Sequence, residues 1–174
     1  MERDKALEAI QIAIQMEIDG KGFYQKQGQN FANQPGRDLF RSLAVEEDMH
    51  RLKFEGIYNA IRDEKGWPEV SLEPGRGKKI TTLFATAAKE AGSGVVAAAT
   101  ELDAVTTAIA METRSYDLYQ ERVGTAAYDA EREFYRALAA EEREHHLTLL
   151  SYYEYLKDPA SWFVDKEHPS LDGG

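Results

Sequence analysis

Apolar side chains recur every three or four residues along most of the chain, and this spacing places them on one face of an α-helix. The pattern predicts four long helices, over about residues 3–32, 36–65, 97–124 and 127–157. In the first of them the apolar stripe runs through Ile10, Ile14, Tyr24 and Phe31. The alternating pattern of a β-strand is nowhere sustained, so the sequence predicts an all-α protein.

The segments between these helices predict how the helices connect. Only a few residues separate the first helix from the second and the third from the fourth, so each pair is expected to form an antiparallel hairpin. A long connection, about residues 66–96, separates the two hairpins; loop sequences are predicted at 66–68 and 75–77 and a short helix at 83–91. Such a connection is long enough to run the length of a helical bundle and reset the direction of the chain.

Residues 1–157 are therefore expected to form one helical domain, and residues 158–174 a short C-terminal tail. Pro159 is expected to end the fourth helix, because proline cannot continue the backbone hydrogen bonding of a helix. The tail carries Trp162 and Phe163, and we expect these two aromatic side chains to dock on the bundle.

The chain is acidic, with 31 acidic and 21 basic side chains among 174 residues and a formal net charge of -10. This balance argues against nucleic acid as a partner, since a nucleic-acid-binding protein would carry a basic face, and against an anionic membrane surface. No stretch approaches the roughly 18 apolar residues of a membrane span. The N-terminus is charged from residue 2 and lacks the apolar segment of a signal peptide, so we expect a cytoplasmic location.

Cysteine is absent from the sequence. Its absence excludes disulfides, cysteine-ligated zinc, iron–sulfur clusters and thiol catalysis.

The two predicted hairpins are copies of one another. Adding 95 to a residue number in the first hairpin gives the equivalent residue in the second, and 16 of the 49 positions in 13–61 are identical to those in 108–156. The fold should therefore have pseudo-twofold symmetry. Both copies keep two glutamates and one histidine at positions where a plain core would favour leucine or alanine.

These repeated polar residues predict a metal centre. A buried carboxylate without a partner is very costly, so it either takes up a proton or binds a cation. Glutamate and histidine three residues apart lie on one face of a helix. Four helices would thus bring four glutamates and two histidines together, as in the di-iron and di-manganese carboxylate bundles. The predicted ligands are Glu17, Glu47, His50, Glu112, Glu142 and His145.

The charges of this ligand set agree with two divalent metals, because four carboxylates balance two doubly charged cations when both imidazoles are neutral. Carboxylate oxygen and imidazole nitrogen suit iron, manganese or zinc better than calcium or magnesium. The competing interpretation is a set of buried salt bridges or solvated helix faces. A single Glu-x-x-His is common by chance, whereas two copies, each 30 residues after an upstream glutamate, favour the metal.

The motifs Glu17-x29-Glu47-x2-His50 and Glu112-x29-Glu142-x2-His145 resemble the paired iron-binding motif of the rubrerythrins, a family within the ferritin-like superfamily. The resemblance covers about residues 5–157. It implies a ferritin-like four-helix bundle holding two iron ions that alternate between Fe2+ and Fe3+ and are oxo- or hydroxo-bridged when oxidised, with manganese or zinc as alternatives.

The resemblance further implies an oxidoreductase that reduces hydrogen peroxide or dioxygen. A homodimer or larger homo-oligomer is implied as well. The rubrerythrins proper carry a rubredoxin domain as electron relay, and this chain, without cysteine, cannot contain one. Reducing equivalents are therefore expected from an external, rubredoxin-like redox protein or from Fe2+ itself.

One ligand of the rubrerythrins is missing from this sequence. They carry a further glutamate one turn beyond the ligand of the third helix, where it takes part in a redox-linked ligand exchange. Here that position is Ser115, and its equivalent in the first half is Gly20. The predicted site then has six protein ligands.

Two other repeated pairs accompany the predicted ligands. Tyr24 and Tyr119 lie seven residues after Glu17 and Glu112, and each either donates a hydrogen bond to a ligand or a bound peroxide or is an amphipathic core tyrosine. Repeated glutamates also stand directly before Glu47 and Glu142. They point about 100° away from the ligands, so a salt bridge or a subunit contact is expected for Glu46 and Glu141.

Three other functions use the same residues differently. A ferroxidase or iron-handling protein would take Fe2+ as its substrate. A di-manganese centre would give catalase-like chemistry. A non-catalytic bundle would serve as an interaction module.

Overall fold

The computed structural model describes residues 2–73 and 75–167, and within them it contains six α-helices and no β-strand. The all-α prediction is therefore confirmed for this part of the chain. In chain order the helices are α1 (Glu2–Gly28), α2 (Gln34–Arg62), α3 (Arg76–Ala91), α4 (Ala99–Thr125), α5 (Asp129–Lys157) and α6 (Pro159–Glu167).

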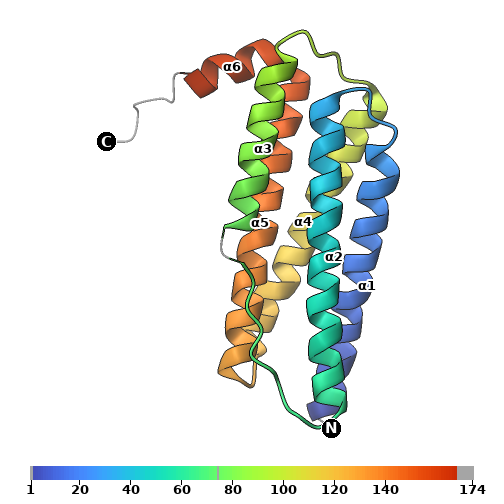
Figure 1. The fold of residues 1–174 in the computed structure, drawn as a ribbon, viewed down its shortest axis with the longest axis vertical. Coiled ribbons are helices and arrows are strands. Elements are labelled where there is room, and N and C mark those ends of the chain that lie inside the picture. The colour runs from blue at the N-terminus through green and yellow to red at the C-terminus, as the bar shows by residue number, and fades with distance from the viewer. Residues whose placement is uncertain (1, 74, 168–174) are drawn as a thin grey trace.

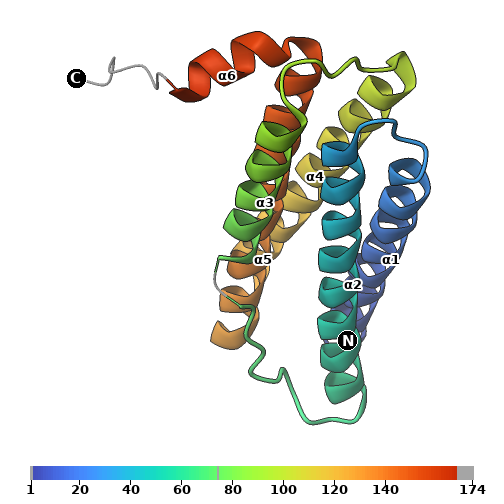
Figure 2. The same cartoon turned by 45° about the horizontal axis from the view of Figure 1, so that its top comes forward.

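Two antiparallel hairpins form the bundle. Helix α1 packs along α2, and α4 packs along α5; α1 also contacts α4, and α2 contacts α5 (Figure 1). The connection between the hairpins starts at the lower end of α2 and climbs the outside of the bundle as α3. It then crosses over the top to α4 (Figures 1 and 2). Because α3 packs on both α2 and α5, this connection covers the seam between the two hairpins.

An arginine repeated in both hairpins holds each tight turn. Arg37 donates hydrogen bonds to the carbonyl oxygens of Phe31 and Ala32, at 2.7 and 3.0 Å. Arg132, its repeat equivalent, donates to the carbonyl oxygen of Ala126 at 3.1 Å. Carbonyls left without a partner beyond a helix end are thus satisfied by side chains in the same way in both copies.

The first predicted helix is too long by four residues at its C-terminal end, because α1 ends at Gly28. Phe31 lies in the turn yet is 4% exposed, and its ring packs on that of Phe40 at a centroid distance of 4.5 Å. A buried aromatic side chain at helical spacing cannot be told from a helical residue by periodicity alone.

Helix α3 begins at Arg76, seven residues before the predicted short helix. It therefore includes Arg76 and Gly77 of the Gly75-Arg76-Gly77 sequence that we expected to be a loop, and Gly75 precedes it as the N-cap. Tertiary packing overrides the poor helix propensity of glycine here. A Cβ atom on Gly77 would lie 2.5 Å from Cβ of Glu144 in α5, so only glycine allows this close approach.

The core consists of two apolar clusters. One contains Phe40, Leu43 and Tyr152 near the α1–α2 turn, and the other contains Phe54 and Phe134 toward the opposite end of the bundle. The predicted metal ligands fall between the two clusters along all four long helices. The site is therefore enclosed by dry packing above and below it.

The C-terminal tail docks as expected for Trp162, which is buried and stacks edge-on against Tyr155 at a centroid distance of 5.3 Å. Its indole N–H donates to Oγ of Ser151 at 3.0 Å. Helix α5 ends at Lys157, and Pro159 then begins α6. The remainder of the predicted tail, residues 168–174, lies outside the described residues.

Across the described residues, none of the helices combines the length and the apolar composition that a membrane crossing requires.

The close contact of α3 with α5 predicts opposite effects for two glycine substitutions. Gly77→Ala should destabilise the metal-free protein by about 1–3 kcal/mol, because the added methyl group collides with Glu144. Gly56 lies at an exposed position of α2, and no atom of the described residues lies within 4 Å of a Cβ added there, apart from its chain neighbours and the adjacent helix backbone. Gly56→Ala should therefore stabilise the protein by up to about 1 kcal/mol. Urea denaturation followed by circular dichroism measures both, and equal stabilisation by the two variants would contradict the docked position of α3.

Candidate metal centre

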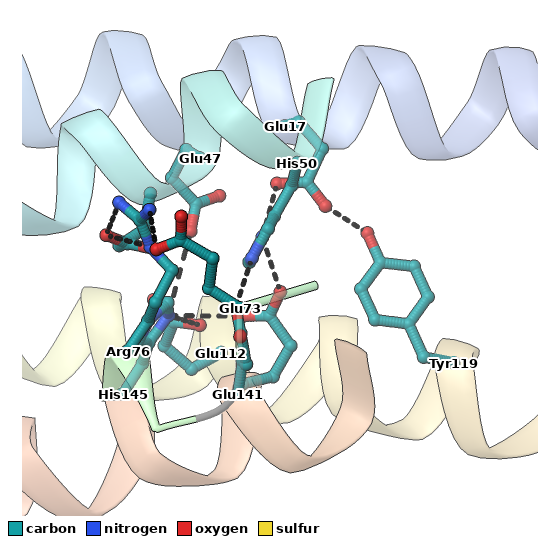
Figure 3. Close-up of polar contacts among 11 residues, drawn as sticks. Glu17, Glu47, His50, Glu73, Arg76, Glu112, Tyr119, Glu141 and His145 are labelled. Atoms are coloured by element: carbon teal, nitrogen blue, oxygen red, sulfur yellow. Dashed lines mark hydrogen bonds and ion pairs between the residues drawn. The ribbon is translucent and has the colours of Figure 1, made fainter. Parts of the chain in front are cut away.

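Six buried side chains from four helices converge at the centre of the bundle (Figure 3). Helix α1 supplies one glutamate, α4 supplies another, and α2 and α5 each supply a glutamate and a histidine. These are the six predicted ligands, Glu17, Glu47, His50, Glu112, Glu142 and His145, and none is more than 5% exposed. The three-residue spacing of glutamate and histidine works as expected, since both members of each pair face the same interior.

The six side chains form two overlapping groups of four. Glu17, Glu47, His50 and Glu142 make one group, and Glu47, Glu112, Glu142 and His145 make the other. Within each group the potential ligand atoms all lie within 4.8 Å of one another. Glu47 and Glu142 belong to both of these groups, whereas the other four members belong to one of them. His50 also falls in a third group of such atoms, with Glu46 and Glu141.

The imidazole nitrogens that face the centre are both Nδ1. Nδ1 of His50 lies 3.4 Å from Oε2 of Glu17 and 3.3 Å from Oε1 of Glu142. Nδ1 of His145 lies 3.7 Å from Oε2 of Glu112 and 3.5 Å from Oε2 of Glu142. Glu142 therefore places one oxygen toward each histidine.

Many of the buried polar atoms at the centre lack a hydrogen-bond partner within the described part of the chain. Buried polar atoms in folded proteins are almost always satisfied, and each exception calls for an explanation such as an ion. The unpartnered atoms are Oε2 of Glu17, Oε1 of Glu47, Nδ1 of His50, both carboxylate oxygens of Glu142, and Nδ1 and Nε2 of His145. Oxygen and imidazole donors left free in this way fit bound transition-metal cations.

Two tyrosines orient the carboxylates of the outer glutamates, and they do so across the two repeats. Tyr24 in α1 donates its hydroxyl hydrogen to Oε1 of Glu112 in α4, and Tyr119 in α4 donates to Oε1 of Glu17 in α1 (Figure 3 shows the second pair). In each carboxylate the bonded oxygen points away from the centre and the second oxygen points toward a histidine. The position of a tyrosine two turns beyond a glutamate on its own helix did not reveal that its partner lies in the other repeat.

Crowded carboxylates shift the protonation of the site. Burial, together with Glu17, Glu112 and Glu142, raises the pKa of Glu47 well above its usual range. Burial and the neighbouring Glu142 raise the pKa of Glu112 to about 8. Burial alone would lower the pKa of His145, but Glu112 and Glu142 raise it to about 10. Without cations the centre therefore holds protons in the places that metals would take.

The repeated glutamates beside the ligands have different partners. Glu46 forms the expected salt bridge, with Arg76 of α3 at 2.7 Å. Glu141 also forms an ion pair, with Nε2 of the protonated His50 at 2.8 Å, so its partner is itself a predicted ligand. Spacing alone gave no sign of this contact. The signal in the sequence was that glutamate is kept at this position in both halves.

A small opening between α1 and α4 reaches the centre. It has a volume of about 90 Å³, and Gly20, Ser115, Glu47 and Glu112 are among the residues that line it. Gly20 leaves room for the carboxylate of Glu47, because a Cβ atom at position 20 would lie 2.5 Å from Oε2 of that glutamate. Two small residues at equivalent positions of the repeat thus keep the α1–α4 seam open beside the ligands.

A protein-family model described as Rubrerythrin matches residues 8–153. The match includes both hairpins, the connection between them and all six side chains of the centre. Searches of curated proteins and of solved structures gave no significant match.

Metal affinity should rise with pH, because protons and metal compete for the same atoms. Glu112 holds a proton below its pKa of about 8, and His145 holds a second ring proton below its pKa of about 10. Both protons must leave before a cation binds to these atoms. The apparent affinity should then increase by up to about tenfold per pH unit for each proton displaced. Titration of the metal-free protein with Mn2+ at several pH values measures this slope, and an affinity independent of pH would contradict the proton-filled site.

The Tyr119→Phe variant should weaken metal binding by about 10–100-fold, because it removes only the hydroxyl that orients Glu17. Tyr135→Phe is the matched control. Tyr135 is buried and stacks on Tyr119 at a centroid distance of 6.0 Å, and its hydroxyl bonds to none of the six side chains in the described part of the chain. Metal titration of both variants measures the difference. Equal metal affinities of the two variants would show that Tyr119 contributes only through packing.

Proposed function

The chain belongs to the rubrerythrin family, and from this we propose that it is a di-iron oxidoreductase. Its proposed substrate is hydrogen peroxide, or dioxygen in its place, and its electrons come from an external redox protein. The observation that carries the proposal is the pair of overlapping ligand groups, which are buried and most of whose members have a donor atom without a hydrogen-bond partner among the described residues. A structural salt-bridge network would pair these carboxylates with arginine or lysine, whereas among the described residues their ion pairs, at 3.3–4.0 Å, are with the two histidines.

The ligand groups suggest how two metals would be held. Glu17 and His50 would bind one metal, Glu112 and His145 would bind the other, and Glu47 and Glu142, which belong to both groups, would lie within reach of both metals. Four carboxylates then carry a charge equal and opposite to that of two divalent cations. This neutrality matters because an uncompensated charge in a dry interior is strongly destabilising.

Bound iron would supply the redox chemistry, since two Fe2+ give the two electrons that convert one peroxide and two protons into two waters. The protein's own part is positional. Tyr24 and Tyr119 hold the carboxylates of Glu112 and Glu17 so that one oxygen of each faces the centre. Burial raises the pKa of both phenols, as do the nearby carboxylates, so the hydroxyls stay protonated and remain donors.

The size of the opening supports a substrate of very few atoms. A volume of about 90 Å³ corresponds to roughly three water molecules at about 30 Å³ each. Peroxide or dioxygen fits such a space, whereas organic substrates occupy pockets of about 300 Å³ or more. The apolar clusters at both ends of the site support the same view, because they leave little room for bulk water.

The missing ligand and the missing cysteines define how this protein would differ from the rubrerythrins proper. With Ser115 at the place of the extra glutamate, the proposed mechanism uses six fixed ligands and no carboxylate exchange at that position. Without cysteine the electrons would arrive from a separate, rubredoxin-like protein. The expected homodimer or larger assembly and the cytoplasmic location stay predictions.

The proposal is tested by mixing the anaerobic di-ferrous protein with hydrogen peroxide in a stopped-flow spectrometer. We expect rapid oxidation with two Fe2+ consumed per peroxide, and no such reaction in Glu142→Ala, which lacks a carboxylate shared by both ligand groups. If peroxide and dioxygen both leave the iron ferrous for minutes, the proposed function is wrong.

Parallel measurements separate the alternatives. A manganese-loaded protein that releases dioxygen from peroxide would indicate catalase-like chemistry. Light scattering after iron loading tests storage, because a cage of many subunits holding far more than two irons per chain is required for it.

A further inference from the structure

The pseudo-twofold symmetry of the centre breaks behind the two histidines. Glu141 and Glu46 are equivalent in the repeat, as are His50 and His145. Oε2 of Glu141 lies 2.8 Å from Nε2 of His50. By symmetry Glu46 should stand behind His145 in the same way, yet Nε2 of His145 has no hydrogen-bond partner among the described residues.

Arg76 accounts for the difference. Its Nε donates to Oε1 and Oε2 of Glu46 at 3.0 and 2.8 Å, and its Nη2 donates to Oε1 at 2.7 Å. An arginine fork on a carboxylate is among the strongest polar contacts in proteins. The pair is also shielded, since the side chain of Glu46 is only 7% exposed. Glu46 is therefore held by Arg76 of α3 and is not free to turn toward His145.

The source of this asymmetry is the connection between the hairpins, which occurs once in the chain. Every predicted ligand has a repeat equivalent, and Glu46 and Glu141 are equivalents of each other. Arg76 lies on α3, outside the duplicated unit. The connection must cross one seam of the bundle, and it crosses the seam between α2 and α5, where Glu46 and Glu141 lie. Two copies of one hairpin thus receive different surroundings.

A carboxylate behind a metal-binding histidine has a defined effect. Because a carboxylate oxygen only accepts hydrogen bonds, the contact keeps the proton of the neutral His50 ring on Nε2, and the lone pair of Nδ1 then faces Glu17 and Glu142, where a metal would bind. Such a partner fixes the ring and increases its donor strength, and its loss typically costs about 10–100-fold in metal affinity. Among residues 2–73 and 75–167, no carboxylate accepts a hydrogen bond from Nε2 of His145.

We propose that the connection makes the two metal positions unequal. Glu141 is a positioning residue that strengthens the position formed by Glu17 and His50. Arg76 withholds Glu46 from His145 and so leaves the position formed with Glu112 the weaker one. This inference rests on the proposed two-metal centre. It adds an order of filling, with the metal at His50 bound first and the metal at His145 bound second.

The test is a calorimetric titration of the metal-free protein with Co2+, whose visible absorption also reports the environment of each bound ion. We expect two steps of one metal per chain, separated by about 10–100-fold in affinity. In Glu141→Gln the tighter step should weaken by about the same factor while the weaker step stays unchanged. A role of Glu141 in folding alone would lower thermal stability without moving the two steps apart or together.

A second set of variants tests the part played by Arg76. Arg76→Met should free Glu46 to reach His145 and tighten the weaker step by about tenfold or more, and the double variant Arg76→Met/Glu46→Gln should lose that gain. Glu73→Gln is the matched control. Glu73 also accepts a hydrogen bond from Arg76, at 3.1 Å, but its side chain is 77% exposed, so both steps should stay as in the parent protein.

The outcomes separate this inference from the proposed function. The inference would be overturned if the parent protein bound both metals with equal affinity, or if Glu141→Gln left the affinity of the tighter step unchanged. Either result would still be compatible with the two-metal centre. A protein that binds no metal would overturn both. Should Arg76→Met fail to fold by circular dichroism, the comparison of Glu141→Gln with the parent protein decides alone.

Discussion

Repulsion among four carboxylates in the middle of the bundle is the constraint on which the rest of the structure depends. Glu17, Glu47, Glu112 and Glu142 are all buried, and no arginine or lysine among the described residues pairs with them. Protons relieve the charge in part, as the high pKa of Glu47 and Glu112 indicates. Two divalent cations would relieve it completely. The apolar clusters above and below hold the helices together around this buried polar centre.

The two hairpins are joined through the site as well as around it. Tyr24 and Tyr119 carry hydrogen bonds from one repeat to the outer glutamate of the other, along the seam between α1 and α4. The same seam contains Gly20 and Ser115 and the opening to the centre. Ligand orientation, hairpin pairing and access to the site are therefore decided by a few residues along one line of contact, and a change in any of them should affect the others.

Much of the fold and most of the centre could be predicted from local rules. Helical periodicity located the four long helices, and the repeat identified all six converging side chains, because equivalent positions on duplicated helices must face the same interior. The failures have a common cause. Phe31 is buried beyond the end of α1, and Gly77 is helical because α5 lies against it. Both positions depend on contacts with residues distant in sequence, and the spacing of apolar residues along the chain does not indicate such contacts.

The sequence by itself determined the chemical composition of the centre, its depth in the bundle and its approximate symmetry, since helix geometry fixes which residues share a face. Only the tertiary structure decided that Glu47 and Glu142 belong to both ligand groups, that the tyrosines reach across the repeats, and that Glu141 is hydrogen-bonded to a histidine whereas Glu46 is bonded to Arg76. The physical reason is the unique path of the connection. A duplicated hairpin encodes two equal halves, but the connection between them can cover only one seam of the bundle. Arg76 on that connection pairs with Glu46, and it has no equivalent in the repeat.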